Sequence, residues 1–291
     1  MVAERGEAGS RDLTIPAADG YPLAATLFLN GRQWLIINSA TGVKRGFYSK
    51  FASYLAEQGY SVVTYDYRGI GGSAPPSLRG SSARMSEWGE LDFAGVMDWV
   101  ERRKPSHMLG LGHSVGGQIL GMLPRAGRLH CFIGVACQSG WWGHWPLPWR
   151  YLLPLGWKVA LPLLVRTFGF LPSSLLGLGE DLPPGVARQW ANWCLHRHYY
   201  HGSIAELPGF RDFAGPLLAY SFSDDRFGPR PAVEAWLRWF AQAETQHRHI
   251  RPGDLGLKRL GHFEFFRQDS VDIFWEPCRR WLAERCGRPS E

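Results

Sequence analysis

The chain has 291 residues, of which 45% are hydrophobic and 20% charged, a composition typical of a globular protein and unlike that of a disordered one. Its net charge of +6 comes mainly from arginines spread along the chain, without the basic runs or modules of nucleic-acid-binding proteins. Five cysteines without metal-ligand spacing predict reduced thiols and no metal site. The first eleven residues lack the apolar segment of a secretion signal, so we expect a cytoplasmic protein.

The first half of the chain alternates predicted strands with predicted helices. A hairpin around Asp19-Gly20 comes first, and apolar strands follow, separated by segments with apolar residues at helical spacing. Such alternation predicts βαβ units, and therefore a mostly parallel sheet with helices on both faces. We expect strands at residues 13–16, 23–29, 34–38, 61–65, 107–111 and 131–137, and helices at 48–58, 84–103 and directly after residue 114.

The alternation stops at Trp141. From there to about Pro208 the chain is rich in Trp, Pro and Leu, and prolines and charged residues interrupt its apolar run, which argues against a transmembrane helix. We therefore expect an inserted, mostly helical cap at 141–208, between two parts of the core at 1–140 and 209–291. The second part resumes with a strand at 216–223, a helix at 231–244, a short strand at 248–252 and a closing helix around residue 277.

One short motif, Gly112-His113-Ser114-Val115-Gly116, has the pattern G-x-S-x-G between a predicted strand and a predicted helix. Its glycines allow the two backbones to approach closely, and so sharp a turn exposes the serine hydroxyl. Because a motif this short arises by chance in a glycine-rich chain, its meaning depends on the other residues that the chain supplies.

Two further residues stand where a serine nucleophile needs them. A serine hydroxyl is a weak nucleophile, so a neutral imidazole must take its proton and a carboxylate must orient that imidazole. Asp225 follows the strand at 216–223, and His262 lies in a Gly-His-Phe turn after the last strand. The alternatives are an ordinary turn serine at Ser114 and a buried structural histidine at His262. Asp224 also remains open, although only one of two consecutive side chains can face the histidine.

Outside the expected cap, the chain resembles the α/β-hydrolase superfamily. The resemblance rests on the segment Tyr65–Ser73 after a predicted strand, on the elbow Gly112–Gly116 and on Gly261-His262-Phe263 near the end. Within the superfamily the chain is similar to a bacterial group of predicted hydrolases with no assigned substrate. The resemblance implies the α/β-hydrolase fold and a catalytic triad, and it implies no metal or organic cofactor.

The order Ser114, Asp225, His262 matches the nucleophile, acid and base of that superfamily. In the family the acid stands four residues before a proline that restarts the chain as a helix. Pro229 stands four residues after Asp225, so the resemblance implies that Asp225, and not Asp224, is the acid.

An oxyanion hole requires two backbone N–H groups aimed at the developing negative charge. Val115, directly after the nucleophile, is expected to supply one. The other is expected from Ser39-Ala40-Thr41-Gly42, the loop after the strand at 34–38, where many hydrolases have His-Gly instead. The donor there is Ala40 or Thr41, and we favour Thr41.

The leading interpretation is a serine hydrolase that cleaves small-molecule carboxylic esters through an acyl-enzyme. Seven of the fourteen tryptophans lie in the expected cap, and Trp141, Trp142 and Trp145 are candidate pocket residues, which favours medium-chain or aromatic acyl groups. An acyltransferase, thioesterase or amidase would use the same triad, and a non-catalytic protein that binds a hydrophobic ligand or partner would keep the fold. Contact of the cap with a membrane surface, through Lys158 and Arg166, ranks below the pocket interpretation. The sequence does not specify an oligomeric state.

Overall fold

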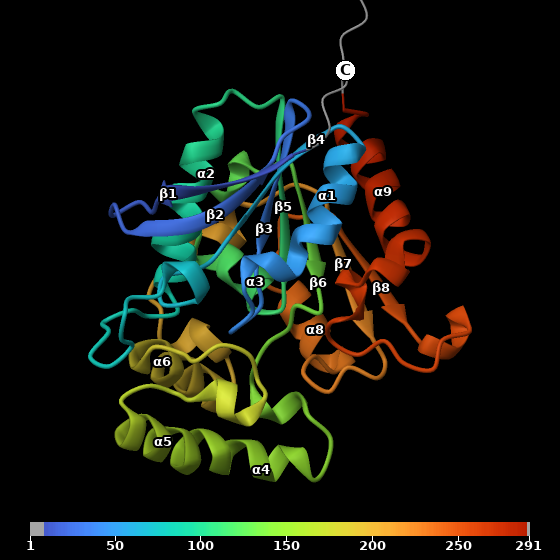
Figure 1. Ribbon diagram of the computed structural model, residues 1–291. Helices are drawn as coiled ribbons and strands as arrows, with labels where there is room; N and C mark the ends of the chain where they lie inside the picture. Colours follow the sequence, from blue (N-terminus) through green and yellow to red (C-terminus); the bar gives the residue numbers. More distant parts are fainter. Residues whose placement is uncertain (1–8, 290–291) are drawn as a thin grey trace, which may run out of the picture.

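The computed structural model describes residues 9–289, so most of the polar N-terminal segment lies outside the described residues. The described chain forms an eight-stranded sheet in the order β1-β2-β4-β3-β5-β6-β7-β8, shown in Figure 1. β1 and β2 form the predicted antiparallel hairpin, β2 pairs antiparallel with β4, and every other pair of neighbours is parallel. The strands are β1 (Ser10–Pro16), β2 (Pro22–Phe28), β3 (Gln33–Asn38), β4 (Tyr60–Tyr65), β5 (His107–His113), β6 (Cys131–Val135), β7 (Leu217–Phe222) and β8 (Thr245–Ile250).

Helices cover both faces of this sheet, which is why β3, β4, β6 and β7 are buried along their whole length. One face packs against α1 (Ser49–Glu57) and α9 (Glu276–Cys286). The other packs against α2 (Ala94–Glu101), α3 (Val115–Gln118) and α8 (Arg230–Leu237). The prediction of a mostly parallel α/β sheet with helices on both faces is confirmed.

The chain between β6 and β7, which we call the insertion (residues 136–216), is mostly helical. It carries α4 (Trp149–Leu155), α5 (Leu161–Phe168), α6 (Pro184–Leu195) and α7 (Pro208–Asp212), and a π-helical turn, Gly156–Ala160, joins α4 to α5. In Figure 1 the insertion lies beyond the carboxyl ends of the parallel strands, with α4 and α5 outermost. Within residues 9–289, no helix combines the length and the apolar composition needed to span a bilayer.

Some element boundaries differ from those predicted. β6 ends at Val135, because Ala136 adopts a left-handed conformation (φ 52°) that turns the chain out of the sheet. The helix expected over 84–103 begins as a π-helix, Trp88–Phe93, and continues as α2. α8 ends well before residue 244, and Phe240 folds back against the Trp236 ring. β8 starts earlier than predicted because it pairs with β7 along its whole length.

Candidate active site

Ser114 occupies the sharp turn between β5 and α3. Its backbone has φ 54° and ψ −117°, a strained conformation for a residue with a side chain. The glycines of the motif make the turn possible, as the sequence predicts. A Cβ on Gly116 would lie 2.2 Å from the Asn38 carbonyl oxygen, and a Cβ on Gly112 would lie 2.4 Å from the Gly117 nitrogen. The surrounding backbone therefore holds Ser114 in a conformation that an isolated turn would not keep.

His262 and Asp225 form a buried pair. The distance from His262 Nδ1 to Asp225 Oδ2 is 2.7 Å, and both side chains are almost completely buried. The other carboxylate oxygen, Oδ1, accepts the backbone N–H of Phe227 at 2.8 Å. The Phe227 ring lies against the imidazole, with 5.3 Å between ring centroids. This arrangement fixes the plane of the imidazole and directs Nδ1 at the carboxylate, so Nε2 is the nitrogen left for chemistry.

Asp224, the neighbouring carboxylate, has a different set of contacts. It accepts the backbone N–H groups of Leu260 and Gly261 at 2.9 and 3.0 Å. The two aspartates therefore point in different directions, as consecutive residues after a strand are expected to do. Asp225 faces the His262 ring, while Asp224 holds the loop on which His262 lies.

The hydroxyl of Ser114 is not bonded to His262. Among the described residues, its hydrogen-bond partner is Gln138, whose Nε2 donates to Ser114 Oγ at 3.5 Å and to the Phe227 carbonyl at 3.1 Å. The Gln138 Oε1 atom is buried and has no partner within the described chain. Hydrogen bonds between catalytic groups are often long in ligand-free enzymes and tighten when substrate binds. The sequence analysis missed Gln138. Its position just after a buried strand, at the edge of the sheet where Ser114 lies, could have identified it as a candidate site residue.

A chain of hydrogen bonds, the Tyr48–His113 relay, joins the loop after β3 to the His262 loop. The Ala40 N–H donates to Tyr48 Oη at 2.8 Å, Tyr48 Oη lies 2.9 Å from His113 Nδ1, and His113 Nε2 lies 2.9 Å from the His262 carbonyl oxygen. Because a carbonyl can only accept, His113 Nε2 carries the proton and Nδ1 accepts from the Tyr48 hydroxyl. Burial, with the nearby His262, holds the pKa of His113 well below its usual value, so the ring is neutral as the relay requires.

The relay bears on the two candidate oxyanion donors in the loop after β3. The Ala40 N–H is already occupied by Tyr48. The Thr41 N–H has no acceptor within residues 9–289. Val115, the other candidate, is the first residue of α3, where backbone N–H groups have no partner inside the helix. Of the two alternatives that the sequence leaves open, Thr41 is therefore the one whose N–H is not already bonded to a described residue.

Hydrogen bonds attach the insertion to segments around Ser114. Glu180 donates its backbone N–H to the loop after β3 (2.7 Å), and Tyr199 donates its hydroxyl to Gln118 in α3 (2.9 Å). Trp145 donates its indole N–H to the loop after β7 (2.9 Å), one residue beyond the carboxylate that faces His262. These segments carry the elbow and the candidate oxyanion and acid residues, so the insertion is attached to elements on several sides of Ser114.

The three candidate pocket tryptophans lie at the start of the insertion. The Trp141 and Trp142 rings are 5.7 Å apart, and Trp145 is the residue bonded to the loop after β7. Trp141 lines a cavity of about 460 Å³ between the insertion and α8, and Ser114 is not part of its wall. The remaining wall is formed by Ser139, His144, Arg197, His198, His201, Ala235, Arg238 and Trp239. A role for the tryptophans in binding an acyl group therefore stays a proposal.

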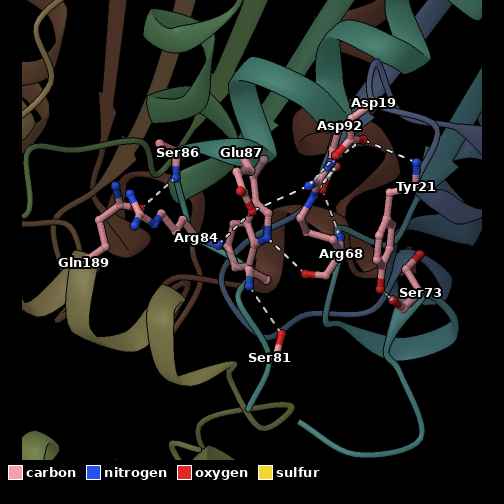
Figure 2. A network of polar contacts seen from close by, with 12 residues as sticks. Asp19, Tyr21, Arg68, Ser73, Ser81, Arg84, Ser86, Glu87, Asp92 and Gln189 are labelled. Carbon is pink, nitrogen blue, oxygen red and sulfur yellow. Dashed lines mark hydrogen bonds and ion pairs between the residues drawn. The ribbon is translucent and has the colours of Figure 1, made fainter. Parts of the chain in front are cut away.

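The loop after β4 carries Arg68, which contributes to structure and does not reach the Ser114 site. Figure 2 shows Arg68 between Asp92 and Asp19. Its guanidinium donates to Asp92 at 2.7 Å and to Asp19 at 2.9 and 3.0 Å. Burial raises the pKa of Asp92 to about 7, against the opposing effect of Arg68. This network joins the β1–β2 turn, the loop after β4 and the helix that leads into α2.

Residues 32–160 match the family model described as serine aminopeptidase, S33. No curated protein sequence matches the chain. Among solved structures, a soluble variant of monoglyceride lipase from Saccharomyces cerevisiae, in complex with a substrate analog, superposes with a TM-score of 0.68 at 13% identity and covers 100% of this chain and 99% of its own.

Two esterases are similar as well. The one from Pyrococcus furiosus has a TM-score of 0.63 at 13% identity and covers 96% of this chain and 92% of its own. The one from Exiguobacterium antarcticum has a TM-score of 0.62 at 19% identity and covers 94% of this chain and 99% of its own. At such identities these structures show a shared fold. The chain therefore has the α/β-hydrolase fold, and its elbow-bearing segment resembles the serine aminopeptidase S33 family.

Proposed function

We propose that this protein is a serine hydrolase that cleaves carboxylic esters, with Ser114 as nucleophile, His262 as base and Asp225 as acid. The observation that carries the proposal is the strained Ser114 elbow together with a buried His262–Asp225 pair at 2.7 Å. Backbone strain costs free energy and persists where the surrounding structure enforces it, most often at functional sites. A protein that only bound a ligand would need neither the strain nor a buried histidine held against a carboxylate.

The mechanism follows from the geometry of these groups. Asp225 accepts the Nδ1–H of His262, which leaves Nε2 to take the proton of Ser114 as Oγ attacks the ester carbon. The backbone N–H groups of Val115 and Thr41 stabilise the tetrahedral oxyanion. His262 then protonates the departing alcohol, and the same histidine activates the water that hydrolyses the acyl-enzyme. Asp225 stabilises the imidazolium that forms on His262.

The proposed substrates are esters of medium-chain or aromatic acids. Support comes from the insertion, which is attached to the loops around Ser114 and is rich in tryptophan and leucine. Each methylene buried against such a surface contributes about 0.8 kcal/mol, roughly a fourfold gain in kcat/KM per carbon until the pocket is full. The similar structures are named as esterases and a monoglyceride lipase, which supports an ester as the bond that is cleaved.

A fluorophosphonate probe tests the nucleophile. We expect one label per chain at Ser114, and none in Ser114→Ala. Ser221→Ala is the matched control, because Ser221 is also buried and its Oγ lies 2.7 and 2.8 Å from two imidazole nitrogens, but in the regular backbone of β7. Labelling of Ser114→Ala, or loss of labelling in Ser221→Ala alone, would contradict the assignment.

A series of p-nitrophenyl esters from acetyl to dodecanoyl tests the substrate class. We expect kcat/KM to rise with chain length and then level off, and to exceed the values for matched thioesters and amides. Preferred turnover of thioesters or amides, or transfer to an added alcohol in place of hydrolysis, would move the assignment to one of the related acyl-transfer activities. A protein that is neither labelled nor active on any of them would be a binding protein on this fold.

A further inference from the structure

The outer side of α4 and α5 is apolar and exposed. Five large side chains on this stretch expose more than half of their surface: Tyr151 73%, Leu152 51%, Leu155 60%, Val159 54% and Leu163 61%. We call these five residues the outer apolar face. In Figure 1, α4 and α5 form the edge of the molecule furthest from the sheet. Of the thirteen exposed large hydrophobic side chains in the described chain, ten lie within residues 147–178, so this exposure is concentrated in the insertion.

The opposite side of the same helices is also apolar. Leu161 and Val165 are buried, and the Trp157 ring packs on Trp190 of α6 with 4.8 Å between centroids. An ordinary surface helix buries one apolar side and turns charged residues to the water. Helices that are apolar on both sides have a second partner, and an exposed apolar patch of this extent marks an interaction surface.

The charges around the outer apolar face indicate which partner that is. Arg150, Lys158 and Arg166 are exposed on the same helices, and no Asp or Glu occurs from Arg102 to Gly179. None of the three cations forms an ion pair with a described residue. Two copies of the chain meeting through this face would bring like charges together. An anionic lipid surface instead satisfies both the apolar side chains and the cations.

We propose that the outer apolar face docks on the surface of an anionic lipid bilayer. The aliphatic side chains enter the acyl boundary, Trp149 and Tyr151 lie at the level of the headgroups, and Arg150, Lys158 and Arg166 meet the lipid phosphates. The helices lie along the interface and do not cross it. The docking itself does not depend on the proposed esterase activity.

Co-sedimentation of the full chain with lipid vesicles tests the docking. Vesicles of phosphatidylglycerol mixed with phosphatidylcholine should bind the protein, phosphatidylcholine alone should bind it more weakly, and added salt should weaken the first interaction. R150Q/K158Q/R166Q should lower the affinity for anionic vesicles about a hundredfold, at roughly fivefold per cation. L152S/L155S/L163S should lower it by at least about a thousandfold, since each leucine contributes roughly tenfold or more.

L29S/L255S is the matched control, because Leu29 and Leu255 are 51% and 40% exposed but lie outside the insertion. It should bind vesicles as the parent does. All three variants should keep the parent melting temperature and its rate on a soluble ester, because every substituted side chain is exposed. Absence of binding to anionic vesicles overturns the proposal, as does a leucine variant that binds like the control. If the parent is dimeric in solution and the L152S/L155S/L163S variant is monomeric, a second copy of the chain covers this face instead.

Discussion

Replacing Tyr48 with Phe removes one oxygen atom from the Tyr48–His113 relay and leaves the ring in place. The side chain is completely buried, so no water can take the position of the lost hydroxyl without a rearrangement. Two groups lose their partner: the Ala40 N–H, which donates to Tyr48 Oη, and His113 Nδ1, which accepts from it. His113 cannot recover by changing tautomer, because its Nε2–H is needed by the His262 carbonyl oxygen.

The expected loss follows from these two orphaned groups. Leaving a buried donor or acceptor unpaired costs about 1–3 kcal/mol each, so Tyr48→Phe should lower the free energy of unfolding by about 2–6 kcal/mol. For a chain of this length that corresponds to a fall in melting temperature of roughly 3–10 °C. The relay holds the loop with Thr41 and the loop with His262 in a fixed relation. We therefore expect kcat on an activated ester to fall about 10- to 100-fold with little change in KM.

Tyr60→Phe provides the matched control for Tyr48→Phe. Tyr60 is as deeply buried as Tyr48, but its hydroxyl has no hydrogen-bond partner within the described chain. Thermal unfolding and steady-state kinetics should show Tyr60→Phe as stable as the parent, or slightly more so, with an unchanged kcat. If Tyr48→Phe melts and turns over like Tyr60→Phe, the relay does not position the site. If both variants lose stability equally, the loss is a general effect of removing a buried tyrosine hydroxyl and does not come from breaking the relay.

Three further outcomes can be measured. Asp225→Asn should lower kcat about 10⁴-fold, because it would no longer hold His262 in the required tautomer. Asp224→Asn should mainly lower the melting temperature, because Asp224 contacts the loop and not the ring. Equal losses of kcat would contradict the different roles assigned to the two carboxylates. The pKa of Asp92 is raised to about 7, so the folded state keeps a proton that the unfolded chain has lost. Stability should therefore fall as pH rises from about 4 to about 7, and Asp92→Asn should flatten this part of a melting-temperature profile. Gly116→Ala should prevent folding or inactivate the protein, because the added Cβ would lie 2.2 Å from a carbonyl oxygen. Gly46→Ala is the control, since its added Cβ would meet no atom within 4 Å, and it should be neutral in unfolding assays.

The sequence by itself determined the fold class and the placement of the elbow. Continuous apolar runs predict strands that are buried on both faces, and β3, β4, β6 and β7 are such strands in the structure. The elbow is also a local property, since Gly112 and Gly116 are needed wherever strand and helix backbones come this close. Element ends were less predictable. β6 stops where Ala136 takes a positive φ, and α8 stops where Phe240 packs back on the core, and neither event has a signal within a few neighbouring residues.

Only the tertiary structure decided which side chains meet. That Asp225 faces His262 while Asp224 holds the loop depends on the direction in which the chain leaves β7. The use of the Ala40 N–H by Tyr48, and the position of Gln138 beside Ser114, depend on packing between segments that are distant in the sequence. The same holds for α4 and α5, whose residues are apolar on both sides. Their composition does not say which side packs on α6, so only the folded chain shows that Leu155 and Val159 face outward while Val165 is buried. Periodicity reports the character of each side of a helix, and contact with the rest of the molecule selects the side that is buried.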